Sequence, residues 1–535
     1  MITKNDEKLD ESSSIEDGNN AKENDYPKGS KLLFIVMALV LAIFLASLDM
    51  TIVATAIPKI TDEFGGLDKV SWYGSAFFMT NGGFQSSWGK AYKYFPLKTT
   101  FLTSVFVFEL GSLLCGVAPN PEALIVGRAI TGVGAAGLGT GVYTIIALIV
   151  EPAKRASYTG IVGISYGAAA VLGPLIGGAF TDKVSWRWCF YINLPVGGVS
   201  ALIIFFLFHT PSASKPIVAT WREKMLQMDF VGVALVMAAL ISYTLALQYG
   251  GQSMAWKSST VIGLLVGSVA IAVAFCCWEF NQGERAMIPP RLMKQRSVSV
   301  SSAFTFLFSG PYFLTIYYLP IYFQSVDGAT PTMSGVYSLP LIIPVTICLI
   351  LSGVCITATG HAAPLEVVGS ALATVASGLL YTLDIDTSTG RWIGYQILGG
   401  VAWGMAWQVP IVIGQGNADP VDLPSITAIV LFFMNLGGTT MLSAAQAAFV
   451  NKLVQELPMT APGVDPAVVV ATGATELRNV FDANQIPGVL MAYMAGIKVA
   501  LAISIAASGL AFAISLLNRW SRLNTEAAKT LGGNA

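Results

Sequence analysis

Residues 31–57 read KLLFIVMALVLAIFLASLDMTIVATAI, and this stretch decides the fold class. A helix needs about 20 apolar residues to cross the hydrocarbon core of a bilayer. The run is long enough to do so, and it is too long for the core of a cleavable signal peptide. Residues 1–30 are polar, which predicts disorder. The sequence therefore predicts a polar tail followed by a first membrane span.

Apolar runs of similar length recur along the whole sequence. They lie at 71–89, 99–117, 122–148, 157–181, 189–208, 229–249, 260–280, 299–325, 334–357, 364–382, 391–413, 424–450 and 489–516. The composition agrees, since 54% of the 535 residues are hydrophobic and 11% are charged, whereas soluble domains carry about 25% charged residues. The sequence predicts an all-α, polytopic membrane protein with 14 transmembrane helices.

The loops between these runs differ in their content of Lys and Arg. Twenty of these residues fall on the side of the two termini and eight on the opposite side. Positive residues favour the cytoplasmic side, so both termini are predicted to be cytoplasmic. The bias comes from the first eight runs and is absent in the loops near 358–363 and 414–423. The longest loop, 451–488, is then extracellular, and we expect its amphipathic segments to cover the bundle rather than gate it.

Several classes of function are disfavoured by the motifs that the sequence lacks. It contains no HExxH, GxSxG or GxxxxGK[ST] pattern. The two histidines, His209 and His361, do not have metal-ligand spacing, and the six cysteines lie in or beside apolar runs. We therefore expect no enzyme activity, no metal and no cofactor, with an ion gradient as the energy source. The net charge of −1 gives no reason to expect a nucleic acid partner.

Charged residues lie inside several predicted spans, and two of them are at similar depths. Asp49 is in the first run and Arg128 is in the fourth. Since the first span runs outward and the fourth inward, both charges are predicted in the outer half of the membrane. Charged groups inside a bilayer are costly and commonly mark an ion or proton pathway. The functional interpretation is a proton-binding carboxylate tuned by a nearby cation, and the alternative is a structural ion pair.

Other polar residues are candidates for lining a substrate cavity. They are Asn81, Gln85, Gln408, Asn435 and Lys498. The amides could equally form hydrogen bonds between helices. Lys498 is predicted near the middle of the last span, at a depth from which snorkelling is difficult. Aromatic residues are dense in the ninth run, where packing and the interfacial belt are the favoured explanation for most of them.

The fifth run contains a distinctive pattern of small residues. It reads GISYGAAAVLGPLIGGAFTD over 163–182 and includes Gly173, Pro174, Gly177 and Gly178. Small residues four apart allow two helices to pack closely, and proline can bend a helix. A closely packed, bendable helix suits a carrier that rocks between two conformations.

Four motifs in order resemble those of a known family. GPLIGG (173–178) resembles the antiporter motif of the major facilitator superfamily, and RAITGVGAAG (128–137) resembles the fourth-span motif of that superfamily. LDMTIVATAIPKI (48–60) and FYINLPVGG (190–198) are similar to motifs of its fourteen-span drug:proton antiporters, with fungal toxin and mycotoxin efflux pumps as the nearest group. The resemblance covers about 31–520.

The resemblance implies a specific organisation. A cytoplasmic tail (1–30) would precede an N-terminal six-helix bundle (31–208), a linker with two inserted helices (209–298), a C-terminal six-helix bundle (299–516) and a cytoplasmic tail (517–535), with the site between the bundles. It also implies that Asp49 couples transport to protons or cations and that Arg128 takes part in proton transfer. The Gly-Pro motif would control helix bending and leak.

The loop after the second span departs from the family pattern. The superfamily usually has G-x-x-x-D-R-x-G-R-R, whereas this sequence has GKAYKYFPLK at 89–98. Gly89 and Lys90 match, but Lys93 occupies the position of the acidic residue. The usual charge relay at this cytoplasmic gate cannot operate in that form.

Together these features predict a secondary active efflux transporter. The expected partners are a hydrophobic small molecule, such as a toxin, secondary metabolite or drug, together with protons and the lipid bilayer. We expect a monomer in the plasma membrane, with a vacuolar or vesicular membrane as the alternative. An importer or siderophore carrier of the same fold, and a membrane sensor that transports nothing, are the competing functions.

Overall fold

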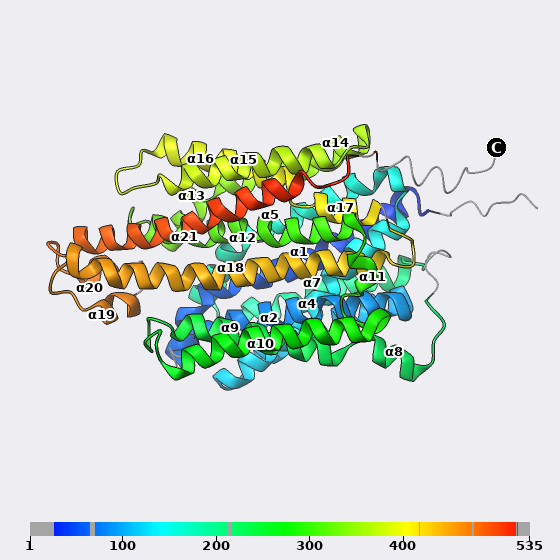
Figure 1. Cartoon of the computed structure of the whole chain (residues 1–535), viewed down its shortest axis with the longest axis horizontal. Coiled ribbons are helices and arrows are strands. Elements are labelled where there is room, and N and C mark those ends of the chain that lie inside the picture. The colour runs from blue at the N-terminus through cyan, green and yellow to red at the C-terminus, as the bar shows by residue number, and fades with distance from the viewer. Residues whose placement is uncertain are drawn as a thin grey trace, which may run out of the picture.

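The computed structural model describes residues 26–64, 70–210, 216–416, 418–472, 474, 476–520 and 522. Long helices run side by side along the longest axis of the molecule (Figure 1). Helix α1 begins and α21 ends at the same end of this bundle, which we call the terminal end. The opposite end carries the short helices α19 and α20, and we call it the loop end.

The helices before residue 210 form one group. They are α1 (Gly29–Phe64), α2 (Val70–Tyr94), α3 (Leu97–Gly116), α4 (Pro121–Ile149), the short η2 (Pro152–Lys154), α5 (Arg155–Lys183), α6 (Trp188–Tyr191) and α7 (Asn193–Leu207). Helix α4 packs against α2 and α3, while α1 packs against α5 and α7. Glycine permits this packing, because a Cβ atom on Gly134 of α4 would lie 2.3 Å from the backbone nitrogen of Phe108.

The helices after residue 295 form a second group. They are α12 (Arg296–Ser325), α13 (Pro331–Tyr337), α14 (Leu339–Thr359), α15 (Ala363–Tyr381), α16 (Thr389–Ala406), α17 (Val409–Gly416), α18 (Leu423–Thr460), α19 (Pro466–Ala471), α20 (Leu477–Val480) and α21 (Ile486–Ser515). Helix α18 continues ten residues into the predicted loop 451–488, whose remainder includes α19 and α20.

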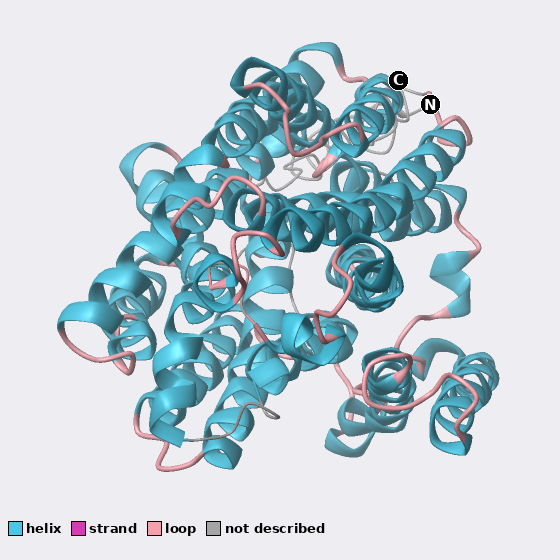
Figure 2. Ribbon diagram, turned by 90° about the vertical axis from the view of Figure 1, so that its left-hand side faces the viewer, coloured by secondary structure: helices cyan, strands magenta, loops and turns pink. Residues whose placement is uncertain are grey.

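Two further long helices lie between these groups in the sequence. The segment contains α8 (Trp221–Gln227), α9 (Phe230–Tyr249), α10 (Ser259–Gln282), η4 (Gly283–Arg285) and α11 (Pro290–Met293). Helix α9 packs against α10 and also contacts α2 and α18. The view along the bundle shows a peripheral helix pair beside the main body (Figure 2).

The prediction of an all-α, polytopic membrane protein is confirmed. Within the described residues, thirteen helical segments are long and apolar enough to cross a membrane. The predicted second span lies in α2, which is 25 residues long but is not one of the thirteen. Polar residues such as Asn81 and Gln85 lower its hydropathy. The total of fourteen spans therefore stays a prediction.

Candidate functional site

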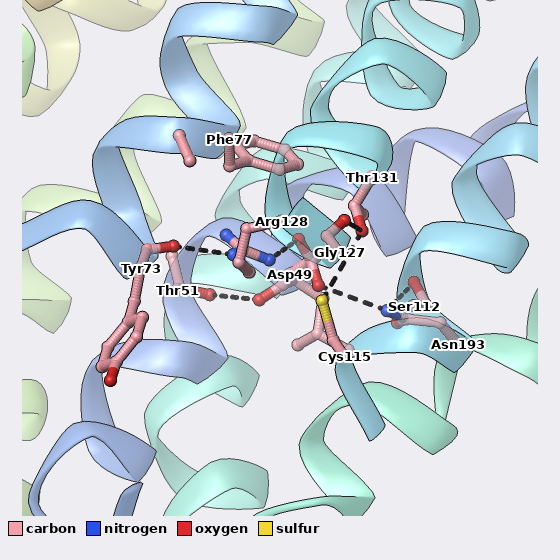
Figure 3. Close-up of polar contacts among 12 residues, drawn as sticks. Asp49, Thr51, Tyr73, Phe77, Ser112, Cys115, Gly127, Arg128, Thr131 and Asn193 are labelled. Atoms are coloured by element: carbon pink, nitrogen blue, oxygen red, sulfur yellow. Dashed lines mark hydrogen bonds and ion pairs between the residues drawn. The ribbon is translucent and has the colours of Figure 1, made fainter. Parts of the chain in front are cut away.

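The two charges predicted inside the membrane meet in the first helix group. Arg128 donates a hydrogen bond through Nη1 to Oδ2 of Asp49, and through Nε to the carbonyl oxygen of Tyr73 at 2.8 Å (Figure 3). The two charged side chains are fully buried, with 1% and 0% of their surface exposed. Removing either charge would leave the other buried without its counter-charge, at a high free-energy cost.

Neighbouring groups hold this ion pair in place. Asn193 of α7 donates through Nδ2 to Asp49 at 3.3 Å and to Ser112 of α3 at 3.0 Å. The Arg128 guanidinium lies over the rings of Phe77 and Phe190, 4.7 and 5.9 Å from their centroids. Cation–π contacts stabilise a positive charge that has lost its water. The pair is thus enclosed by α1, α2, α3, α4, α6 and α7.

The antiporter motif of α5 contacts α1 next to the ion pair. A Cβ atom on Gly173 would lie 2.1 Å from Oγ1 of Thr51, and this hydroxyl donates to the carbonyl of Ala169 at 3.0 Å. The carbonyl of Gly177 lies 3.8 Å from the thiol of Cys189, whereas a Cβ atom on Gly178 would meet nothing within 4 Å. Pro174 lies within the helix, and its side chain is outside the described part of the structure.

A central cavity lies between the two helix groups. Three of the predicted cavity residues, Asn81, Gln85 and Asn435, line it. Gln85 donates through Nε2 to Thr140 at 2.8 Å and accepts a longer bond of 3.4 Å from Asn435. This last bond crosses from α2 to α18, so the amides connect the two groups at the cavity.

Aromatic side chains form the wall of the cavity on the side of the second group. They are Tyr312, Phe313, Trp403 and Trp407, and the rings of Tyr312 and Trp407 are 4.5 Å apart. The first group adds Phe77 and Tyr166. Among the described lining residues none is Asp, Glu, Lys, Arg or His. An apolar, aromatic wall with a few amides suits an uncharged, hydrophobic ligand.

A second cavity adjoins the first and shares Phe313 and Asn435 with it. It lies between α2, α9 and α18, and its residues Ser75 and Ser443 are nearer the loop end than Asn81 and Asn435. The empty space between the helix groups therefore extends from the centre of the molecule towards the loop end.

The structure places the other two predicted cavity residues elsewhere. Gln408, between α16 and α17, donates to the hydroxyl of Tyr143 at 3.3 Å and is not in the wall of the cavity. Lys498 forms an ion pair with Asp384 at 2.6 Å, and both side chains are partly exposed. The hydrogen bond from Lys498 lowers the pKa of Asp384 below its ordinary value. Lys498 thus reaches the loop after α15, contrary to the expectation from its depth.

The two helix groups are in close contact at the terminal end. A Cβ atom on Gly89 of α2 would lie 2.4 Å from Cβ of Ala428 on α18. On the other side of the interface, a Cβ atom on Gly160 of α5 would lie 2.7 Å from the carbonyl oxygen of Leu349 on α14. Both pairs of helices touch through their backbones there, so the space between the groups is closed towards the terminal end.

Ion pairs reinforce this closed end. Lys93 of α2 contacts Asp422 at 2.7 Å, Asp422 contacts Arg291 at 2.9 Å, and Arg291 contacts Glu284 at 2.9 Å. Burial alone would raise the pKa of Asp422, but the hydrogen bonds and charges of Lys93 and Arg291 outweigh it and hold the pKa below its ordinary value. We call these four residues the terminal latch.

The latch lies where the sequence departs from the family's loop pattern. Lys93, which stands where the family has an acidic residue, finds its acidic partner on the second helix group. Lys90, which matches the family pattern, is buried and donates to Gln227 at 3.2 Å and to the carbonyl of Glu284 at 2.5 Å. The contacts of α2 therefore include the segment that carries the inserted helices.

Sequence reasoning missed some residues of the site. Asn193 lies within the quoted stretch FYINLPVGG, so its position could have been noticed, but its bond to Asp49 requires the fold. The aromatic residues of the ninth run gave an ambiguous signal. Packing was the favoured interpretation, whereas Tyr312 and Phe313 in α12 face the cavity.

The fold and this site define a polytopic membrane carrier with a cavity between two helix groups. Residues 39–441 match the Major Facilitator Superfamily, and the chain belongs to this family. It is 56% identical over 504 residues to the MFS-type transporter grgE of Penicillium sp, covering 94% of this chain and 89% of that one. It is 52% identical over 514 residues to the probable efflux pump gsfJ of Penicillium aethiopicum, covering 96% and 92%.

The fold is also found in a solved structure. The human organic anion transporter MFSD10 superimposes with a TM-score of 0.59 at 14% sequence identity, covering 91% of this chain and 100% of that chain. The protein is a transporter of this superfamily rather than an enzyme, as its sequence predicts, and is embedded in a membrane by many helices.

Proposed function

We propose that the protein exports an uncharged, hydrophobic, aromatic small molecule in exchange for protons. The observation that carries this proposal is the position of Asp49. Helix α1 contributes Ser47 and Met50 to the cavity wall, while Asp49 between them contacts Arg128 inside the first helix group. A change of charge at Asp49 therefore acts on a helix that also touches the substrate space.

The coupling step follows from this geometry. When a proton binds Asp49, its O–H bond forms and the attraction to Arg128 is lost, while Arg128 keeps the carbonyl of Tyr73 as an acceptor. The equilibrium between the two conformations of the carrier then shifts, because α1 moves relative to α5. These two helices pack through the contact of Gly173 with Thr51. Substrate and proton bind at separate places and compete through the helix that joins them.

The direction of export rests on the closed terminal end. With cytoplasmic termini, as the distribution of Lys and Arg predicts, the cavities extend towards the outside of the cell. Such a conformation releases substrate outward and takes up protons from outside. The name of the similar efflux pump of Penicillium aethiopicum supports the same direction. The protein would act as a monomer without a cofactor, in the plasma membrane or, alternatively, in a vacuolar or vesicular membrane.

The test is proton movement in liposomes that contain the purified protein and a pH-sensitive dye. A panel of uncharged aromatic natural products is added to wild type and to Asp49→Asn. We expect a compound to trigger proton flux in wild type and not in the variant. Glu151→Gln, which removes an exposed carboxylate paired with Lys154, is the matched control and should behave as wild type. Substrate movement without linked proton flux, unchanged in Asp49→Asn, would refute the coupling.

A further inference from the structure

A second carboxyl group lies inside the first helix group, close to the ion pair. Glu109 of α3 points at α7, because a Cβ atom on Gly197 would lie 1.7 Å from its Oε1 and 3.3 Å from Leu45 of α1. The glycine leaves the space that the carboxyl group occupies. Glu109 therefore lies at a junction of α3, α7 and α1, and the residue as a whole is half-buried.

The carboxyl group of Glu109 has an unusual environment. Both of its oxygen atoms are shielded from solvent, and within the described structure neither has a hydrogen-bond partner. A buried carboxylate without a donor or a counter-charge is costly, whereas the neutral acid carries its own proton and avoids most of this cost. The site is thus suited to hold a proton that can be given up when a suitable acceptor appears.

The register of the helices connects Glu109 to Asp49. Ser112 is three residues after Glu109 on α3, and Asn193 is four residues before Gly197 on α7. Residues at these spacings share a helix face, one turn of about 5.4 Å apart. Ser112 and Asn193 bond to each other, and Asn193 bonds to Asp49. The carboxyl group of Glu109 therefore lies about one turn from this network, on the side of the terminal end.

The surrounding charges agree with a role in proton exchange. Asp49 faces Glu109 from α1, and Arg128 on α4 is engaged by Asp49 and Tyr73. Other titratable side chains near this level are Cys115 on α3, Cys189 and Tyr191 on α6 and Tyr73 on α2, and α7 has none. No cation on the described elements is within ion-pair distance of Glu109. Two carboxyl groups so close to one another favour a state in which one is charged and the other protonated.

We infer that Glu109 is a second proton-binding residue of the exchange, and this inference rests on the proposed coupling at Asp49. A proton passes between the carboxyl groups of Asp49 and Glu109, which lie on either side of the bonded pair Ser112 and Asn193. One O–H bond breaks at the donor carboxyl and one forms at the acceptor, so that one carboxylate and one acid are present before and after. Arg128 pairs with Asp49 whenever the proton is on Glu109.

The experiment is infrared difference spectroscopy of the full chain in lipid between alkaline and acidic pH. A protonated carboxyl group without a hydrogen bond gives a separate C=O stretching band. We expect this band in wild type and in Glu151→Gln, and its loss in Glu109→Gln. Glu109→Asp should restore a shifted band, which distinguishes a proton site from a structural role. Thermal unfolding of each variant shows that the fold is retained.

The same variants are then compared in the liposome assay. Glu109→Gln should move the pH dependence of proton-driven exchange, and Glu109→Asp should return it towards that of wild type. An unchanged band in Glu109→Gln, or an unchanged pH dependence, would overturn the role of Glu109. Failure of the proposed function has a different signature, because proton flux would then be absent in wild type while the infrared band of Glu109 persists.

Discussion

The two helix groups bury different kinds of side chain. The interior of the first group holds charges, with Asp49 and Arg128 paired at its centre. The second group faces the cavity with the rings of Tyr312, Trp403 and Trp407, and its own buried carboxyl group, Glu366, bonds to Asn518 away from the cavity wall. In the proposed exchange, this difference separates the proton-binding residues from the residues that contact substrate. Coupling must then pass through helices that touch both, of which α1 is the clearest case.

The largest expected effect comes from breaking the charge pair in the first group. Arg128→Met leaves Asp49 buried without its counter-charge, which should cost about 3–5 kcal/mol of stability and abolish exchange. Thermal unfolding of the purified protein measures the first effect and the liposome assay the second.

The double variant Asp49→Asn with Arg128→Met sharpens this test. It leaves no buried charge at the site, so much of the stability should return while coupled exchange stays absent. If the double variant were no more stable than Arg128→Met, the cost would lie in packing against Phe77 and Phe190 rather than in charge.

The next effect concerns the interface between the groups at the terminal end. Gly160→Ala places a Cβ atom 2.7 Å from the carbonyl of Leu349, and such overpacking costs about 1–3 kcal/mol. The conformation closed at this end should be destabilised. A cysteine introduced at Ser157, which bonds to Thr357 across the interface at 2.8 Å, should then react faster with an impermeant thiol reagent added from the terminal side.

The same helix supplies the control for this experiment. Gly178→Ala introduces the same methyl group where nothing lies within 4 Å. It should leave the reactivity of the introduced cysteine unchanged, in a background from which the six native cysteines have been removed. Equal reactivity in the Gly160 and Gly178 variants would contradict closure through this contact.

The terminal latch offers a charge-based version of the same test. Lys93→Glu faces Asp422 with a like charge and loses a charge-assisted hydrogen bond of about 1.5–3 kcal/mol. Thiol reactivity from the terminal side should rise, and Lys93→Gln, which removes the positive charge without adding a negative one, should raise it less. Reactivity of Lys93→Glu equal to that of the unaltered latch would show that the latch does not depend on charge.

The pH dependence of the latch should differ from that of exchange. Because the pKa of folded Asp422 is below its ordinary value of 3.8, its carboxylate stabilises the closed end at any pH above that value. This contribution is lost only as the pH falls through the lowered pKa. With the cysteine at position 157 in both, the ratio of thiol reactivity between Lys93→Glu and the unaltered latch should therefore be constant across neutral and mildly acidic pH. The ratio is the quantity to compare, because the reactivity of any thiol falls as its thiolate is protonated.

The sequence predicts the fold and the centre of the site, but not the contacts between distant helices. Asp49 and Arg128 could be placed at similar depths because depth in a membrane can be counted along each span, but their contact could not be predicted. The partner of Lys93 could not, since Asp422 follows more than 300 residues later. For the same reason, the sequence could not show which of the predicted amide side chains line the cavity. Asn81 and Asn435 face the cavity while Gln408 bonds to Tyr143, because the rotation of each helix is set by packing.

The aromatic wall of the second group predicts a smaller effect on binding. Trp407→Leu removes ring contacts with Tyr312 and Phe313 at the cavity and should weaken substrate binding by about 0.5–1.5 kcal/mol. Coupling should be unaffected, since no charge changes. Trp392→Leu is the control, because Trp392 packs on Phe323 and Tyr337 away from the cavity wall. Equal loss of binding in both variants would show that the effect is structural.

The smallest effect is expected at Lys498, the one ionisable residue that the sequence places in the second group at mid-membrane depth. Its ion pair with Asp384 is partly exposed, and pairs of this kind contribute about 0–1 kcal/mol. Lys498→Met should therefore leave both stability and proton-coupled exchange close to wild type. A large loss of exchange in Lys498→Met, at unchanged stability, would place a functional charge in the second group and break the division between charged and aromatic halves.

The variant Asp384→Asn then shows which partner of the ion pair matters. A loss of exchange caused by the ion pair would appear in both variants. A loss caused by the ammonium group alone would appear only in Lys498→Met.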